Sequence, residues 1–350
     1  MHTPYTRRRR RPFKGTFATP PRGEGGRTYA AIDLGTNNCR MLIAKAKGGG
    51  FTVVDSFSRI VRLGEGVSAS GRLAPDAIAR TIDALKVCAG KISTWKVRRL
   101  RNVATEACRR AENAADFYDQ VEARTGLKLE TISAQEEAGL TLAGCRPLFA
   151  STARHALVFD IGGGSTEIAW VALDPGEAPR TIEVISLPYG VVTAAEEFRH
   201  MPAPEAAFDA IVARIDSQLD AFERRHRIAR VIDDDTFQML GTSGTVTTLG
   251  GIHLGLRRYD RKKVDGLSLP LEAIVDISGR ILAMSAAERA NHPCIGRQRG
   301  DLMIPGCAIL GAISRRWPAP KLSIADRGIR EGLLLAMIHR DRPPLMGGIS

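Results

Sequence analysis

The sequence predicts an α/β protein built from two similar halves, and three observations support this class. First, the segment 32–40, IDLGTNNCR, is similar to the segment 159–167, FDIGGGSTE, which lies 127 residues further along. Second, each segment runs from an apolar stretch through an Asp and a turn into another apolar stretch, as a strand–turn–strand unit does. Third, a further strand pattern and then helical patterns follow each unit. An internal duplication explains all three observations.

In the first half, alternating and apolar runs predict three antiparallel strands joined by tight turns. Apolar residues then recur every three or four positions from Ile78 to Ile92, which predicts an amphipathic helix that begins near Pro75. The predicted strands are 29–34, 41–46, 51–62, 100–104 and 128–132, and the later predicted helices are 113–124 and 134–143.

In the second half, the strand that ends near Asp160 is followed by a returning strand, a third strand and a long helix. The long helix is predicted from a stripe of apolar residues between Phe208 and Phe222. The remaining predicted elements are strands 180–187, 236–240 and 321–324, and helices 246–254, 271–284, 302–316 and 329–338. We therefore expect a basic arm (1–27), a first domain (28–142), a second domain (143–342) and a short tail (343–350).

The chain carries 50 Lys and Arg residues against 38 Asp and Glu residues, a net charge of +12. The first 27 residues hold eight basic residues and one acidic residue, including the run Arg7–Arg11. We expect this arm to be disordered, either as a solvated tail or as a contact for a polyanion. No apolar run approaches the length of a membrane span, and the six cysteines form no C-x-x-C pair. These features predict a cytoplasmic protein without membrane contact, and the oligomeric state stays open, with a homodimer among the options.

Glycine and small polar residues at the turns are suited to holding phosphate groups. Glycine permits backbone conformations in which several N–H groups converge on one anion, and neighbouring hydroxyls add donors. Each turn taken alone has a simpler interpretation as an ordinary tight turn. The candidate phosphate-binding residues are Thr36, Asn37 and Asn38 in the first turn, Gly162, Gly163, Gly164, Ser165 and Thr166 in the second, and Ser243, Gly244 and Thr245 in a third turn before a helix.

Acidic residues flank the second turn, with Asp160 before it and Glu167 after it. Carboxylates at such positions are hard oxygen ligands, the kind that Mg²⁺ or Mn²⁺ prefers when phosphates and waters complete its shell. The equivalent acid of the first unit is Asp33. We therefore expect Asp33, Asp160 and Glu167 to hold a divalent metal ion. The chain has no G-x-x-x-x-G-K-[ST] motif, which excludes a P-loop protein.

Seven motifs in a fixed order give the chain a family resemblance. They are AAIDLGTNNCRMLI, VRLGEGV, VATEACRRAEN, ISAQEEAGL, VFDIGGGSTEI, GTSGTVTTLGG and IADRGIREGLLL. The chain resembles the exopolyphosphatase / guanosine-pentaphosphate phosphohydrolase family of the actin-like superfamily, from about residue 28 to residue 336. The resemblance implies two RNase-H-like domains, each with a mixed five-stranded sheet flanked by helices, and a cleft between them.

The resemblance also implies an activity and residue roles. The activity is Mg²⁺-dependent hydrolysis of the terminal phosphoanhydride of polyphosphate or guanosine pentaphosphate. Glu137 matches the base that activates water, while Asp160 and Glu167 match acids that hold the metal or assist the water. Arg40 and Arg109 match arginines that contact phosphate, and the segment with Arg299 and Asp301 adds two further candidates. Thr36, Asn37 and Asn38 replace the family's usual Ser-Asn-Ser, so this loop has lost its third hydroxyl.

Three other functions stay open at this point. An ATP-dependent kinase of the same superfamily would need a nucleoside pocket, for which the third turn is a candidate. A protein that binds polyphosphate or a guanosine polyphosphate without hydrolysing it would not need Glu137. A nucleic-acid binder would depend on the arm and would be sensitive to salt. The sequence does not decide between polyphosphate and guanosine pentaphosphate as substrate.

Overall fold

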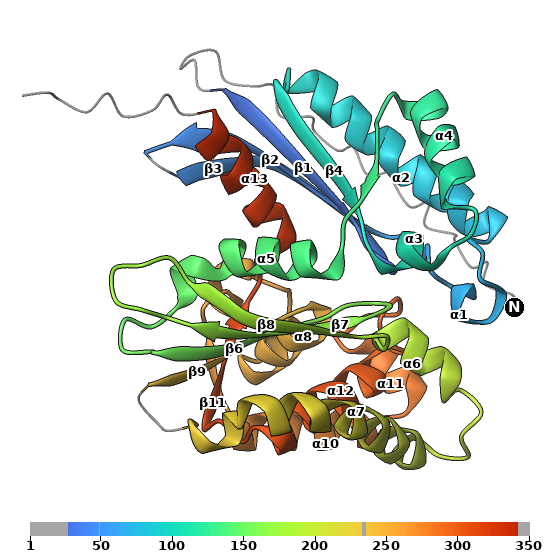
Figure 1. The fold of residues 1–350 in the computed structure, drawn as a ribbon. Coiled ribbons are helices and arrows are strands. Elements are labelled where there is room, and N and C mark those ends of the chain that lie inside the picture. Colours follow the sequence, from blue (N-terminus) through green and yellow to red (C-terminus); the bar gives the residue numbers. More distant parts are fainter. Residues whose placement is uncertain (1–26, 49, 233–235, 342–350) are drawn as a thin grey trace, which may run out of the picture.

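The computed structural model describes residues 27–48, 50–232 and 236–341, so the arm with Arg7–Arg11 and the tail 343–350 lie outside the described residues. The chain forms two lobes, each built on a mixed β-sheet that helices cover (Figure 1). The two predicted sheets are thus confirmed. The predicted site residues lie at the interface between the two lobes.

The first sheet has the strand order β3-β2-β1-β4-β5. Strands β1, β2 and β3 are antiparallel, as predicted, whereas β4 and β5 run parallel to β1. The strands are β1 (Thr28–Leu34), β2 (Asn38–Lys47), β3 (Gly50–Ile60), β4 (Arg99–Ala104) and β5 (Glu130–Thr131).

Helices α2 and α4 cover one face of this sheet, and α13 covers the other. Pro75 is the first residue of α2, and the predicted stripe Ile78, Ile82 and Leu85 is buried against the sheet. The helices of this half are α1 (Val67–Ser70), α2 (Pro75–Thr94), α3 (Glu106–Arg110), α4 (Ala114–Thr125) and α5 (Ala134–Cys145).

The second sheet repeats the topology of the first, with the order β10-β11-β9-β6-β7-β8. Its strands β6, β7 and β8 correspond to β1, β2 and β3, which confirms the duplication. It also has a sixth strand, so the expectation of five strands is wrong for this lobe: β10 has only three residues and contains a proline. The strands are β6 (His155–Ile161), β7 (Thr166–Ala172), β8 (Arg180–Leu187), β9 (Phe237–Thr242), β10 (Ser268–Pro270) and β11 (Lys321–Ala325).

Helices α7, α10 and α12 pack on the outer face of the second sheet, where they form its largest apolar core. The helices of this half are α6 (Val191–Glu197), α7 (Pro204–His226), α8 (Gly244–His253), α9 (Arg261–Val264), α10 (Leu271–Ala283), α11 (Ala286–Asn291), α12 (Met303–Arg316) and α13 (Ile329–Arg340). Two 3₁₀ turns, Arg146–Leu148 and Ile228–Arg230, complete the elements.

Helices α5 and α13 cross between the two sheets (Figure 1). Helix α5 packs on the second sheet through Leu142 and Cys145, whereas α13 packs on the first sheet through Leu333. The last helix of the described residues, α13, therefore returns to the first lobe, although it lies in the predicted second domain. The division at residues 142 and 143 stays a prediction.

In each sheet, the strand register pairs the residue before the glycine turn with a residue after it. Asp33 lies opposite Arg40 in the first sheet, and Asp160 lies opposite Glu167 in the second. The parallel strands β1, β4, β6 and β9 all end at the line between the lobes. Ligands of α/β proteins bind beyond the carboxyl ends of such strands, so a binding site is expected at the interface between the lobes.

All six cysteines lie in the described residues, and each is buried and free of a disulfide. Within those same residues, every helix is too short or too polar to cross a bilayer.

Candidate active site

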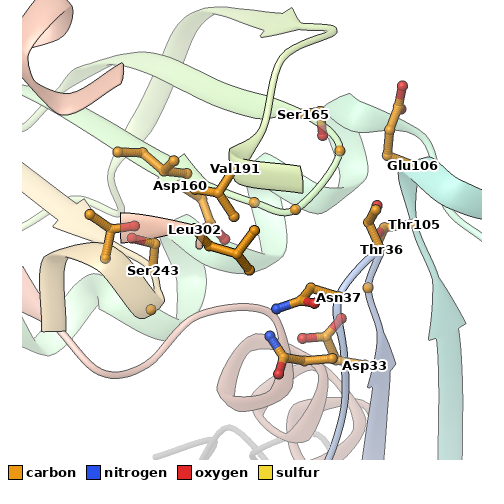
Figure 2. Close-up of a pocket in the computed structure, with 18 of the residues that line it drawn as sticks. Asp33, Thr36, Asn37, Thr105, Glu106, Asp160, Ser165, Val191, Ser243 and Leu302 are labelled. Carbon is orange, nitrogen blue, oxygen red and sulfur yellow. The ribbon is translucent and has the colours of Figure 1, made fainter. Parts of the chain in front are cut away.

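A cavity between the lobes is lined by almost every residue that the sequence predicts for the site (Figure 2). Asp33 and Asn37 of the first lobe face Asp160 and Ser243 of the second across this space. The predicted residues in its wall are Asp33, Thr36, Asn37, Asn38, Arg40, Glu137, Asp160, Gly162, Gly163, Gly164, Ser165, Ser243, Gly244, Thr245 and Arg299.

The two glycine turns have the same internal hydrogen bond. Gly35 N donates to Asn38 O at 2.9 Å, and Gly162 N donates to Ser165 O at 2.9 Å. The turns also approach each other closely, because a Cβ atom on Gly163 would lie 2.9 Å from Thr36 Cβ. Glycine is therefore required at this position for contact between the lobes.

Two side-chain oxygens of the first turn, from residues that line the cavity, have no protein hydrogen-bond partner among the described residues. Asn37 Oδ1 and Asn38 Oδ1 are buried and have no hydrogen-bond partner within the described chain. Burial of an unpaired acceptor is costly, so each of these oxygens would be stabilised by a hydrogen-bond donor such as a water molecule.

The third turn, at the start of α8, also contributes to the cavity. Ser243 caps the helix, with its Oγ accepting a hydrogen bond from Val246 N at 3.1 Å. Its backbone has a φ of 154°, which is unusual for a residue other than glycine. The free N–H groups of the helix start and the neighbouring Gly244 thus face the cavity as a place for an anion.

Glu137 lies in the first turn of α5 and is 6% exposed. Its Oε2 accepts a hydrogen bond from Arg109 Nη1 at 2.7 Å. Burial raises the pKa of Glu137 well above its usual value, repulsion from Glu167 and Asp160 adds to this, and Arg109 opposes it. A carboxylate with a raised pKa that is held in one orientation is suited to accept a proton.

Arg109 is held by three hydrogen bonds and by a longer ion pair between its Nη2 and Glu167. Its Nε donates to Glu106 Oε2 at 2.9 Å, and its Nη1 donates to Ile132 O at 3.0 Å and to Glu137. Its Nη2 is buried without a hydrogen-bond partner among the residues described, and it lies 3.7 Å from Glu167 Oε1. Arg109 therefore lies behind the cavity wall, in contact with Glu137.

Three residues that the sequence predicts for the site do not line the cavity: Arg109, Thr166 and Glu167. The Thr166 hydroxyl donates to Tyr189 O at 2.7 Å. Glu167 Oε1 accepts hydrogen bonds from Ser165 Oγ at 2.6 Å and from Ser186 Oγ at 2.9 Å. Burial raises the pKa of Glu167, whereas these two hydroxyls lower it. Glu167 is thus connected to the cavity through Ser165, and its charge raises the pKa of Glu137.

Of the three predicted metal ligands, Asp33 and Asp160 line the cavity and Glu167 does not, and the described residues contain no cluster of three or more His, Cys, Asp or Glu side chains arranged as a metal site. Burial raises the pKa of Asp33 and that of Asp160, to about 7 for Asp160. Repulsion from Glu167 and Asp33 contributes to the shift of Asp160, while Arg40 opposes it. A bound cation would relieve both the burial and the repulsion, and two carboxylates leave coordination positions for waters and phosphates.

A second cavity of about 540 Å³ continues from the first, since Arg40 and Arg299 line both. Arg330 of α13 joins them in its wall. None of these three arginines has an ion pair in the described ranges, and burial lowers the pKa of Arg299 and of Arg330. Unpaired guanidinium groups in a cavity favour an anionic ligand.

Sequence reasoning missed Thr105 and Glu106, which line the first cavity, and Arg330, which lines the second. Glu106 lies three residues before Arg109 in α3, a helix that was not predicted, and at this spacing the two side chains meet on one face of the helix. Thr105 and Arg330 had no local signal, since the packing of distant segments brings them to the site.

The duplicated sheets, the two crossing helices and the cleft between the lobes define an actin-like fold. Within this class the chain belongs to the Ppx/GppA phosphatase family, whose model matches residues 42–341.

Individual relatives resemble the chain along most of its length. It is 30% identical over 322 residues to Exopolyphosphatase 2 of Mycobacterium tuberculosis, a match that covers 88% of this chain and 98% of the relative. The crystal structure of the Aquifex aeolicus family member superposes with a TM-score of 0.71 at 30% identity, over 91% of this chain and 99% of the other. An exopolyphosphatase-like protein gives a TM-score of 0.80 at 30% identity, over 89% and 99%.

Proposed function

We propose that this chain hydrolyses the terminal phosphoanhydride bond of inorganic polyphosphate and releases orthophosphate. The observation that carries the proposal is the buried Glu137 carboxylate, which Arg109 orients at the wall of a cavity between two glycine turns. The Mycobacterium tuberculosis relative has the name of an exopolyphosphatase, which supports the same reaction.

Substrate binding follows from the groups that have no partner in the protein. The terminal phosphate would lie between the two glycine turns, with backbone N–H groups of the turns as donors. The remaining phosphates would continue toward Arg40, Arg299 and Arg330 in the second cavity.

In the chemical step, Glu137 takes a proton from a water molecule as the water oxygen attacks the terminal phosphorus in line. The new P–O bond forms as the bridging P–O bond breaks, and the shortened chain leaves with the electron pair. The turn donors stabilise the charge on the equatorial oxygens. Mg²⁺ or Mn²⁺ held by Asp33 and Asp160 would supply further positive charge to the phosphates.

Guanosine pentaphosphate is a second candidate substrate, because a cavity of about 540 Å³ has room for a nucleoside beside the phosphates. A binding protein without activity and an ATP-dependent kinase are the competing functions.

One substrate panel separates these functions. Phosphate release is measured from long-chain polyphosphate, guanosine pentaphosphate and ATP, each with Mg²⁺, with Mn²⁺ and with a chelator. We expect release from polyphosphate that depends on the metal. Tight binding of polyphosphate without release would contradict the proposal and favour a sensor, and transfer of phosphate from ATP to an acceptor would favour a kinase.

A further inference from the structure

An ion pair joins the two lobes at the mouth of the cleft. Arg62, which follows β3 in the first lobe, donates through Nη2 to the two carboxylate oxygens of Asp301 in the second lobe, at 2.9 and 3.3 Å. A second bridge lies nearby, where Gly66 N donates to Glu196 Oε1 at 2.9 Å. Figure 1 places α1 and α6, which flank this region, away from α13.

On the first lobe, Arg62 is tied directly to the first glycine turn. The backbone N–H groups of Val61 and Arg62 donate to Asn37 O at 2.9 and 3.0 Å, and Gly64 N donates to Thr36 O at 2.9 Å. Arg62 also has a left-handed backbone, with a φ of 49°. This conformation is unfavourable for arginine, so the surrounding hydrogen bonds must hold it in place. They fix the backbone of Arg62, and hence the base of its side chain, beside the first glycine turn.

On the second lobe, Asp301 belongs to the short loop that brings Arg299 and Leu302 into the cavity. Leu302 N donates to Arg299 O at 2.9 Å, so Asp301 lies inside one closed turn. The guanidinium of Arg299 lies beside Gly244 at the start of α8, since a Cβ atom on Gly244 would be 3.7 Å from Arg299 Nη1. A displacement of Asp301 would therefore move Arg299.

Stability of the fold does not account for this pair. The side chains of Arg62 and Asp301 are 35% and 52% exposed, and exposed pairs contribute about 0–1 kcal/mol to folding. What distinguishes it from other exposed pairs is that each partner is attached to a different phosphate-contacting segment of the site.

We propose that Arg62 and Asp301 are a positioning pair that holds Arg299 in register with the first glycine turn when the lobes close around substrate. The proposal rests on the proposed hydrolysis of polyphosphate. The pair does not touch the reacting atoms, and it acts through the placement of the two segments.

A double-mutant cycle on the full chain tests the pair. Arg62→Ala and Asp301→Ala are each expected to lower kcat/KM for polyphosphate about fivefold to tenfold, and the double variant is expected to lose no more than either single variant. Arg62→Lys retains the charge and is expected to recover part of the loss. Melting temperatures should stay at the wild-type value.

A matched control is Asp276→Asn, which breaks an exposed ion pair with Arg280 inside α10 and should leave kcat/KM unchanged. Wild-type activity in Arg62→Ala, or losses that simply add in the double variant, would overturn the positioning role and leave the proposed function intact. An inactive wild-type chain would overturn the proposed function, and this inference with it.

Discussion

At the scale of the residue, the proposed reaction depends on the contact between Glu137 and Arg109. Glu137 must be ionised to accept a proton, and its pKa is raised by burial and by neighbouring carboxylates. The reaction is therefore expected to accelerate as the pH rises through this raised pKa, and to be slow in acid.

Arg109 lowers the pKa of Glu137, so replacing Arg109 with a neutral residue should raise that pKa. Arg109→Gln should move the acidic limb of the kcat/KM profile to higher pH, because the charge that favours the carboxylate is lost. Arg109→Lys retains the positive charge, so the acidic limb of its kcat/KM profile should lie closer in pH to that of the wild type. The orientation that Arg109 gives to Glu137 is lost in this variant. The check is a pH–rate profile of the three proteins, and a limb that stays in place or moves to lower pH in Arg109→Gln would contradict this role.

Most residues of the cavity can be predicted because they lie at strand ends and turns, where a local pattern marks them. Asp33 and Asp160 are examples, since each ends an apolar run before a turn. Thr105 reaches the cavity only because β4 lies beside β1, and Arg330 only because α13 returns to the first lobe. No local sequence pattern predicts residues that tertiary packing brings to the cavity in this way.

At the scale of the element, the two glycine turns form one unit across the cleft. A Cβ atom on Gly163 would lie 2.9 Å from Thr36 Cβ and 3.1 Å from Asn37 N, so any side chain there would separate the turns. Gly163→Ala should therefore lower kcat/KM by about tenfold to a hundredfold, since the proposed binding mode places the terminal phosphate between the two turns.

The control for this substitution is Gly90→Ala in α2, where the added methyl group meets nothing within 4 Å. This change should leave activity as it is and raise the free energy of unfolding by up to about 1 kcal/mol, through helix propensity. Full activity of Gly163→Ala would show that contact between the turns is not required.

The elements themselves could be predicted where their patterns are long. The strands of both meanders and the long helices have clear periodicity, and the structure confirms them. Helix α6 and strand β10 could not be predicted, because VVTAAEE has no apolar stripe and SLP has three residues with a proline. Both depend on tertiary packing, with the start of α6 hydrogen-bonded to the second turn through Val191 N and Gly162 O.

At the scale of the whole molecule, α5 and α13 connect the lobes and set their spacing. The helices touch backbone to backbone, since a Cβ atom on Gly144 would lie 2.2 Å from Gly328 O and one on Gly332 would lie 2.1 Å from Leu140 O. A hinge near residues 138–145 is an expectation from the two-lobed architecture, and this close crossing is where such a hinge would act.

Gly144→Ala should destabilise the chain by about 1–3 kcal/mol, because the helices must move apart. Gly139→Ala lies in the same helix with open space around the added methyl group, and its stability should match or exceed that of the wild type. Urea unfolding followed by circular dichroism measures both variants. Equal stability of the two would contradict a close crossing between the lobes.

The measurement that tests the central claim most directly is phosphate release from long-chain polyphosphate by the wild type, Glu137→Gln and Glu136→Gln. Glu136 is the neighbouring acid on α5, and it pairs with Arg101 at 2.6 Å instead of lining the cavity. We predict that Glu137→Gln loses activity by about a hundredfold to ten-thousandfold while it still folds and binds polyphosphate, and that Glu136→Gln stays active. Equal activity of Glu137→Gln and the wild type would contradict the assignment of Glu137 as the base, and with it the proposed mechanism.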